Sequence, residues 1–399
     1  MGKQTEKTID LRAPEAYINR ELSWLSFARR VLSFVEDPEV PLLERIKFAG
    51  IMGMLHDEFF MKRISGLKRQ IRRGVNKVSL DGRTPVIELR DCRKVILEQA
   101  STLAKVLNKN IRPALLDAGI PILDWSDLNN KHKSLLKKYF KHSVMPILTP
   151  LAVDAEHPFP FISNLGLNLA IELKKPDRER FIRIKVPANR DRWVPLNDGA
   201  GFIPLEQVIA ANLDLLFPQE SKLKAFFFRL TRGAKGDDDA GLSLDVTNGE
   251  LIPGSIISQV TNELKARRFA GPVRLQVAAN MPVDMRHWLT SQLETEPEDI
   301  YDNEELLGIA ELLKFKVQGR PELRDLPHKP VTHPRLRKLN SMDSDSIFQE
   351  IRRGDILLHH PYYSFNTSVL HFLEAAAVDP KVLAIKLTIY RTSSDSPII

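Results

Sequence analysis

The segment VMPILTPLAVDAEHPFPFIS, residues 144–163, divides the chain into two kinds of sequence. Its prolines, at positions 146, 150, 158 and 160, exclude a long helix, because each removes a backbone donor and clashes with the preceding turn. Helical periodicity precedes the segment and strand-like patterns follow it. We therefore predict a multidomain fold in which an α part is followed by an α+β part.

Residues 13–118 show the periodicity of a helical bundle. In RELSWLSFARRVLSF, residues 20–34, apolar side chains recur at spacings close to i, i+3 and i+4 and predict one buried stripe. The stripe consists of Leu22, Leu25, Phe27, Val31 and Leu32. A second helix is predicted after Pro41, a third over residues 57–73, and a fourth from about Arg90 to Leu116. We assign these residues to an N-terminal helical domain.

Residues 119–320 are predicted to form an α+β head domain. LGLNLAIEL (165–173) and RFIRIKV (180–186) are typical of strands, and the second alternates apolar with basic side chains. After a polar loop, SIISQVTNELKARR (255–268) is helix-like and PVRLQVA (272–278) is strand-like. A length of about 200 residues is ordinary for one domain.

Four prolines within residues 321–340 predict an extended linker between domains. Residues 341–399 then begin a strand–helix–strand unit, with strands expected over 355–361 and 381–390 and a helix over 368–379. Such a unit predicts a parallel sheet. One unit cannot cover both faces of its sheet, so we expect an incomplete α/β domain with exposed sheet edges.

The composition favours a globular protein in a reducing compartment. Hydrophobic residues make up 43% of the 399 residues and charged residues 27%. No window approaches about 18 uninterrupted apolar residues, and the first residues lack a secretory signal, so no transmembrane segment is predicted. Cys92 is the single cysteine, which excludes an intramolecular disulfide framework and a cysteine-based zinc site. We expect a cytoplasmic protein.

The chain is basic, with a formal net charge of +7 and an isoelectric point near 9.3. This balance favours polyanionic partners: nucleic acid, nucleotides, acidic lipid or inorganic phosphate polymers. Residues 61–80 contain no acidic residue but many basic ones, namely Lys62, Arg63, Lys68, Arg69, Arg72, Arg73 and Lys77. A neutralising ligand explains this run, and so does a solvated face or an acidic partner domain.

A second basic group lies in KARRFAGPVRLQV, residues 265–277. It consists of Lys265, Arg267, Arg268 and Arg274. The dipole of a helix C-terminus explains it better than a ligand does.

The last predicted strand contains one basic residue and is followed by another, and both are candidates for ligand binding. Lys386 stands in the otherwise apolar and threonine-containing run 382–390, where a buried lysine needs a partner. Arg391 follows at the carboxyl end of the strand, the edge at which parallel sheets bind ligands. Its planar fork suits phosphate. Two explanations stay open: an anion site, or local pairing of Arg391 with Asp395 or Asp379.

No short catalytic signature accompanies these residues. The ten histidines lack metal-ligand spacing, and the sequence has no glycine-rich phosphate loop, nucleophile elbow or nucleic-acid-binding signature. Any identification therefore depends on longer stretches.

Six longer stretches resemble, in this order, the landmarks of the polyphosphate kinase type 1 family. They are RELSWLSFARRVL, LLERIKFAGI, DEFFMKRISGLKRQ, PILTPLAVDAEHPFPFISNLGLNLAIEL, DILLHHPYYSF and DPKVLAIKLTIYRTSSDSPII. The resemblance implies reversible transfer of the terminal phosphoryl group of ATP to inorganic polyphosphate through a phosphohistidine. It further implies binding of ATP, ADP and Mg²⁺, a homo-oligomer, and the start of a phospholipase-D-like α/β domain at 341–399. Nucleic acid is then not an expected partner, and the location is cytoplasmic or peripheral at the inner membrane.

The resemblance also assigns ATP- and phosphate-binding roles. Arg391 matches the family's arginine at the ATP and magnesium site, where a guanidinium would hold phosphate oxygens that share the metal. Lys386 of the last predicted strand and Lys62 and Arg63 of the basic run are further candidates for contacts with ATP or phosphate, because of their positive charge. Leu55 stands where the family has an asparagine that helps to bind ATP, and leucine offers no hydrogen bond.

The phosphorylated histidine is the other departure from the family pattern. None of the ten histidines lies in the matching motif, and the motif is expected beyond Ile399. We therefore expect a truncated form without activity of its own. The alternative is a non-catalytic paralogue that binds polyphosphate or nucleotide.

Overall fold

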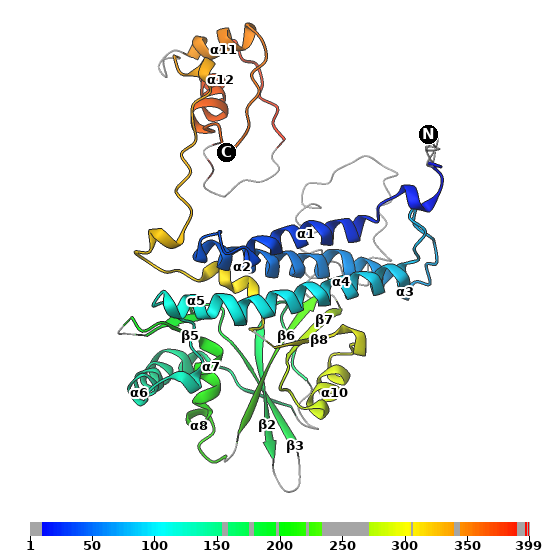
Figure 1. Ribbon diagram of the computed structural model, residues 1–399, viewed down its shortest axis with the longest axis vertical. Coiled ribbons are helices and arrows are strands. Elements are labelled where there is room, and N and C mark those ends of the chain that lie inside the picture. The colour runs from blue at the N-terminus through cyan, green and yellow to red at the C-terminus, as the bar shows by residue number, and fades with distance from the viewer. Residues whose placement is uncertain are drawn as a thin grey trace, which may run out of the picture. The chain divides into compact units, whose positions relative to one another are not determined.

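The computed structural model describes residues 10–153, 159–174, 179–196, 199–220, 223–233, 271–304, 306–338 and 344–388, together with 396 and 398. The chain divides into two compact units, Met1–Arg324 and Asp325–Ile399 (Figure 1). In the part of the chain just defined, no helix is long and apolar enough to cross a membrane.

The first unit begins with a layer of long helices. α1 spans Arg20–Glu36 and α2 spans Leu42–Phe59. A π-helical turn, Phe60–Ile64, joins α2 without a break to α3, Ser65–Arg72. α4 spans Pro85–Val106 and passes through a second π turn, Leu107–Ile111, into α5, Arg112–Asp117. The predicted second and third helices are therefore one helix, because no proline or glycine cap separates them.

Capping and burial explain the position of α1. The Asn19 side chain accepts a hydrogen bond from Leu22 N at 2.9 Å and fixes the first turn. The buried side of α1 faces α2 and α4 and is formed by Leu25, Ala28, Val31, Leu32 and Val35. The inclusion of Phe27 in the predicted stripe was wrong. Its side chain is 52% exposed, because two residues from Leu25 correspond to a rotation of about 200° around a helix.

A six-stranded sheet lies beside this helical layer. Its strands are β1 Leu151–Val153, β2 Leu167–Lys174, β3 Glu179–Lys185, β6 Lys224–Arg232, β7 Pro272–Ala278 and β8 Ile300–Asn303. The order is β1-β3-β2-β6-β7-β8, and all neighbours are antiparallel except β7 and β8. A separate hairpin pairs β4 Trp193–Pro195 with β5 Phe202–Pro204. The strands predicted at 165–173, 180–186 and 272–278 are confirmed.

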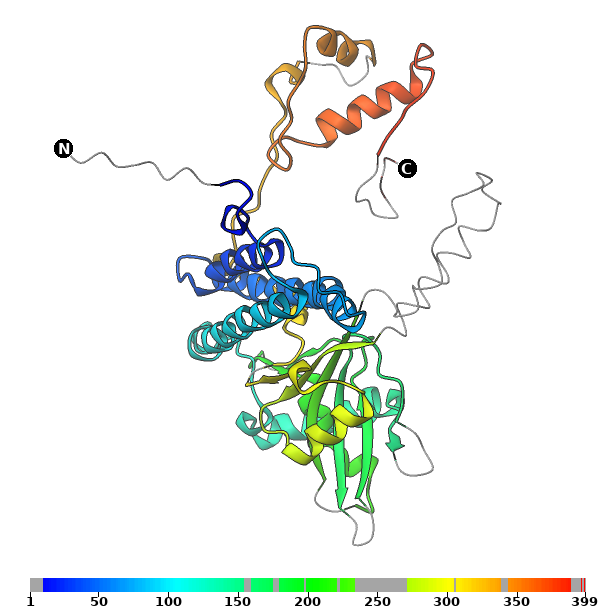
Figure 2. The same cartoon turned by 90° about the vertical axis from the view of Figure 1, so that its right-hand side faces the viewer.

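Different helices cover the two faces of the sheet (Figures 1 and 2). Side chains of α6 (Asn130–Tyr139) and α7 (Leu205–Ala211) form one cluster with Ile182 and Ile184 of β3. α10 (Val283–Gln292) packs on the opposite face, and the short α8 (Leu213–Leu216) follows α7. The alternation of β3 thus places its isoleucines on one face and Arg183 and Lys185 on the other.

The helical layer and the sheet share a core. Leu25, Phe59, Phe60, Ile64, Cys92 and Ile96 form one buried cluster with Val273 of β7 and Tyr301 of β8. A 3₁₀ helix, Ile309–Lys314, also packs on α2. The predicted boundary between a helical domain and a head domain stays a prediction, since both parts lie in one compact unit.

The second unit is small and helical in its described residues. α11 spans Ser344–Arg352, and a π turn, Asn366–Leu370, leads into α12, His371–Val378. Leu336, Ile347 and Ala375 form its buried cluster. The helix predicted over 368–379 is confirmed.

The strands predicted in the second unit were wrong as far as they are described. Residues 355–359 and 382–388 have no strand pairing. Lys386, expected to be buried, is exposed. An isolated strand has no partners for its backbone N–H and C=O groups, and the described residues supply no neighbouring strand to either segment.

Candidate functional site

Three of the candidate residues lie on the continuous α2–α3 helix: Leu55, placed by the family pattern, and Lys62 and Arg63, taken from the basic run. Leu55 is half-buried and packs against the apolar cluster shared by α1, α2 and α4. About two turns further on, Lys62 is exposed and its Nζ lies 2.6 Å from the Glu58 carboxylate. Arg63 is partly exposed, with Nε 3.6 Å from Glu21. Lys62 and Arg63 therefore place positive charge at the surface, whereas the Leu55 side chain packs against the hydrophobic core.

The basic run on this helix is not wholly exposed. Lys68 is 6% exposed and forms a buried ion pair with Asp299, with Glu296 at 3.6 Å. Burial raises the pKa of Asp299, and the hydrogen bond from Lys68 opposes this shift. Part of the charge that suggested a ligand is thus neutralised within the chain itself.

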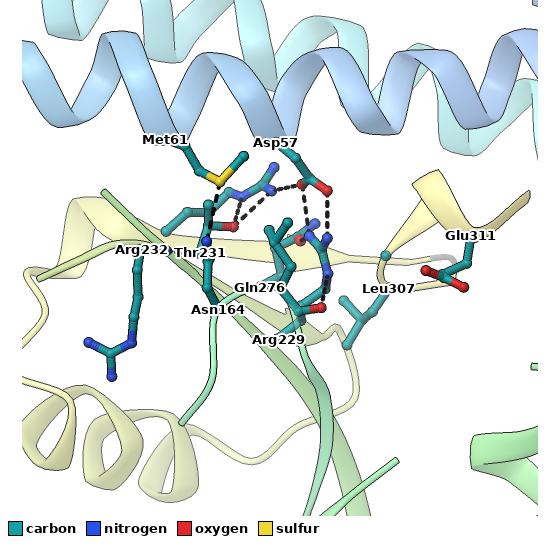
Figure 3. A network of polar contacts seen from close by, with 12 residues as sticks. Asp57, Met61, Asn164, Arg229, Thr231, Arg232, Gln276, Leu307 and Glu311 are labelled. Atoms are coloured by element: carbon teal, nitrogen blue, oxygen red, sulfur yellow. Dashed lines mark hydrogen bonds and ion pairs between the residues drawn. The ribbon is translucent and has the colours of Figure 1, made fainter. Parts of the chain in front are cut away.

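Asp57 is the centre of a buried ionic network that joins α2 to the sheet (Figure 3). Its two carboxylate oxygens accept hydrogen bonds from Arg229 of β6, at 2.8 Å from Nη1 and 2.5 Å from Nη2. Arg274 of β7 donates to the same carboxylate. Burial favours a raised pKa for Asp57, but the two guanidinium groups outweigh it and hold the pKa below its usual value.

Arg274 and Arg229 are held by further polar groups. Arg274 donates to Thr231 Oγ1 at 3.0 Å, and its guanidinium lies 4.2 Å from the centre of the Phe60 ring. Burial lowers its pKa to about 10, although Asp57 opposes that shift. Arg229 donates to Gln276 Oε1 at 2.9 Å. Arg274 is therefore a buried structural cation, and the helix-dipole explanation does not describe it.

A cavity of about 400 Å³ adjoins this network between α2, α4 and strands β6 to β8. His56, Arg286 and Tyr301 also line it, and Arg286 pairs with Asp302 at 2.6 Å. His56 is buried, its Nε2 lies 2.9 Å from Gln99 Oε1, and burial lowers its pKa. The arginines that line this cavity are paired with carboxylates. We therefore interpret these ion pairs mainly as structural contacts that hold the helices against the sheet.

The sequence pattern missed Arg229 and the role of Asp57. A cation inside the apolar run KAFFFRLTR, residues 224–232, was an available signal, of the same kind that drew attention to Lys386. Its partner could not be identified, because Asp57 lies 172 positions away.

The remaining assigned residues lie elsewhere. Lys386 is exposed in the second unit. Arg391 lies outside the described residues, as do Lys265, Arg267 and Arg268. Among the residues that are described, no group of three or more His, Cys, Asp or Glu side chains is placed to hold a metal ion.

Comparison with known families matches three consecutive regions. Residues 17–123 match the polyphosphate kinase N-terminal domain, residues 131–315 the polyphosphate kinase middle domain, and residues 346–399 the polyphosphate kinase C-terminal domain 1.

Individual relatives agree with these matches. The polyphosphate kinase of Mycobacterium ulcerans is 42% identical over 98% of this chain and 53% of its own length. That of Mycolicibacterium gilvum is 43% identical over 99% of this chain and 54% of its own. The crystal structure of polyphosphate kinase from Porphyromonas gingivalis shares the fold, with a TM-score of 0.76 and 23% identity over 96% of this chain and 53% of that one. The chain spans about half the length of the relatives it matches, and it belongs to the polyphosphate kinase family.

Proposed function

We propose that this chain acts in the reversible transfer of the terminal phosphoryl group of ATP to inorganic polyphosphate. The observation that carries the proposal is 42% identity to a polyphosphate kinase across 98% of the chain. In this reaction a histidine nitrogen takes the γ-phosphoryl group, ADP leaves, and the end of the polyphosphate chain then takes the phosphoryl group from histidine. Positioning and charge neutralisation are the main tasks of a protein in such chemistry.

The exposed cations supply charge for that task. Lys62 and Arg63 lie at the surface of one helix. The exposed pair of Lys62 with Glu58 is weak enough for phosphate oxygens to compete, and the 3.6 Å separation of Arg63 Nε from Glu21 leaves the Arg63 guanidinium without a close hydrogen bond to that carboxylate. We assign them to the binding of ATP or polyphosphate phosphates. Arg391 and Lys386 are proposed for the same class of contact, with Mg²⁺ bound to the phosphate oxygens that Arg391 holds.

The 399 residues alone are proposed to bind phosphate compounds without turnover. None of the ten histidines lies in the family's nucleophile motif, and a phosphoenzyme needs a positioned nucleophile. A cytoplasmic or peripheral inner-membrane location and a homo-oligomeric state belong to the same proposal.

A non-catalytic paralogue that binds polyphosphate or nucleotide is the second candidate. Leu55 favours it, because an apolar side chain packed on the core replaces the family asparagine. A site that lacks one hydrogen-bond partner of its ligand loses affinity.

The test is incubation of the purified chain with γ-labelled ATP and Mg²⁺, together with a separate titration with polyphosphate. We expect saturable polyphosphate binding and no acid-labile, base-stable phosphate on the protein. Label on the protein would show that one of its own histidines is a nucleophile and would overturn the binding-only assignment. A folded chain that binds neither ATP nor polyphosphate would overturn the proposed function.

A further inference from the structure

A second cavity, of about 320 Å³, lies on the head region and is separate from the network around Asp57. Its described lining consists of Phe161, Ser163, Asn164, Arg183 and Lys185. Two of these residues are cations and none is a carboxylate. Four other cavities of this unit have both an arginine and an acidic side chain in their described lining, so this lining differs from theirs in charge.

Arg183 is the buried cation of this cavity. Only 8% of the residue is exposed to solvent, and its Nε donates a hydrogen bond to Asn168 Oδ1 at 2.8 Å. Among the described residues no carboxylate pairs with it, and within that part of the chain no hydrogen bond engages its two terminal amino groups. Burial lowers the pKa of Arg183, as expected for a desolvated cation that lacks a counter-charge. A bound anion would remove this electrostatic cost.

Asn168 makes the position of Arg183 rigid. The Asn168 side chain is fully buried, and its Nδ2 donates to the carbonyl of Gly166 at 2.8 Å while its Oδ1 holds Arg183. The two residues lie on adjacent strands, β2 and β3. The guanidinium is therefore held in place before any ligand arrives, which reduces the entropy cost of binding.

A buried hydroxyl group lies in the same cavity. Ser163 Oγ has no hydrogen-bond partner among the residues that the structure describes. A Cβ atom added at Gly166 would lie 2.8 Å from Ser163 Oγ and 3.5 Å from Lys185 Cε. Ser163 and Lys185 therefore converge on one small space that only glycine leaves open. A hydroxyl, an ammonium and a guanidinium are the donors that a phosphate group requires.

The loop that carries Ser163 also contacts the continuous α2–α3 helix, which carries the basic run. Asn164 Nδ2 lies 3.2 Å from Met61 Sδ, and Asn164 Oδ1 accepts a hydrogen bond from Arg232 N at 2.8 Å (Figure 3). Met61 directly precedes Lys62 in the chain. The cavity thus lies next to the helix to which the proposed function assigns phosphate contacts.

We propose that the cavity formed by Ser163, Arg183 and Lys185 is a head-region subsite for a phosphate unit of an inorganic polyphosphate chain. The inference rests on the proposed function and extends it to a site away from the reacting phosphoryl group. A polymer can bind this subsite and the cations Lys62 and Arg63 of the α2–α3 helix at the same time. Because one chain then makes both sets of contacts, its affinity exceeds that of either site alone. Orthophosphate binds here more weakly, because it makes only the local contacts.

The test is calorimetric titration of the full chain with tripolyphosphate, orthophosphate, long-chain polyphosphate and oligouridylate. Arg183→Gln should weaken tripolyphosphate binding by about tenfold or more, the value of one charged hydrogen bond. Lys185→Gln should weaken it severalfold. Gly166→Ala should weaken it without a change in charge, because its methyl group fills the space beside Ser163. The matched control is Lys224→Gln, which removes one positive charge at an exposed position of β6 and should leave binding unchanged.

The outcomes separate this inference from the proposed function. Long-chain polyphosphate binding that persists unchanged in Lys185→Gln and Gly166→Ala would overturn the subsite while leaving the proposed function intact. Absence of polyphosphate binding in the unmodified chain would overturn both. Binding of oligouridylate as tight as that of long-chain polyphosphate would overturn the assigned ligand. Lys185 is exposed, so its variant tests the site even if Arg183→Gln fails to fold.

Discussion

The carboxylate of Asp57 and the guanidinium of Arg229 form a two-pronged ion pair between α2 and β6, 172 residues apart in the chain. Both side chains are at least nine-tenths buried. The pair fixes the helix that carries Lys62 and Arg63 against the sheet. The surface cations therefore have a rigid support beneath them, which a phosphate-binding surface needs if it is to hold its ligand in one orientation.

Removal of the Asp57 charge should strongly destabilise the first unit. Asp57→Asn leaves Arg229 and Arg274 buried without their shared counter-charge, so the free energy of unfolding should fall by about 3–5 kcal/mol. Urea denaturation followed by circular dichroism measures the change. Glu58→Gln, at the adjacent position with an exposed pair to Lys62, should change stability by less than about 1 kcal/mol. Equal effects of the two substitutions would contradict the structural role of Asp57.

His56 should make stability depend on pH in the weakly acidic range. Its pKa is lowered from a usual value of 6.5, so the unfolded chain binds the proton more readily than the folded one. The stability associated with neutral His56 is therefore fully present above about pH 6.5 and is lost as the pH falls through the lower folded value.

The corresponding experiment compares urea denaturation of the wild type and His56→Gln between about pH 7 and pH 5. Glutamine keeps a donor for Gln99 but does not titrate, so its stability should fall less steeply with pH. His142→Gln, at an exposed position, serves as control. A steeper or unchanged slope in His56→Gln would exclude this role.

Two glycines of the α2–α3 helix should respond oppositely to alanine. A Cβ on Gly53 would lie 2.9 Å from the backbone carbon of Ile309, so Gly53→Ala must displace the 3₁₀ helix at Ile309–Lys314 and should cost about 1–3 kcal/mol. A Cβ on Gly66 meets nothing within 4 Å. Gly66→Ala should instead gain about 0.5–1 kcal/mol from helix propensity. Thermal denaturation of both variants measures the contrast, and destabilisation by both would show that the packing of α2 is described wrongly.

Leu55 should limit ATP affinity. Leu55→Asn restores the residue that the family pattern expects, so ATP binding should become tighter by several-fold if the helix forms part of a nucleotide site. The same change removes an apolar contact with the core, and stability should fall slightly. Titration with ATP and with tripolyphosphate separates the two effects. Unchanged ATP affinity in a folded Leu55→Asn protein would favour the non-catalytic candidate.

Local patterns in the sequence predicted the elements of the first unit well. The apolar spacing of α1 and the alternation of β3 are properties of one segment, and both were confirmed apart from Phe27. Contacts between residues that are far apart in the sequence were not predictable. Asp57 meets Arg274 across 217 positions, and no periodicity encodes that contact. The strand expected over 381–390 shows the same limit in its described residues, because apolar and β-branched residues become a strand only beside another strand.

The exposure of the candidate residues could be predicted only in part for the same reason. Lys62 is exposed and Arg63 is partly exposed, and helical periodicity alone makes this property predictable for Lys62. The structure shows that Lys68 of the same run is buried against Asp299, and the sequence could not distinguish it from its neighbours. Arg183 was predicted only as one basic residue of an alternating strand, since its burial depends on residues outside that strand, such as its partner Asn168.

The most direct test of the account is the affinity of the purified chain for inorganic polyphosphate at several salt concentrations, with single-stranded RNA as competitor. We predict saturable binding that weakens with salt, resists the RNA, and falls severalfold in the Lys62→Gln, Arg63→Gln double variant with a shallower salt dependence. Lys47→Gln, which removes an exposed charge elsewhere on α2, should leave the affinity unchanged. Absence of polyphosphate binding by the folded chain, or complete displacement by RNA at equal phosphate concentration, would contradict the account.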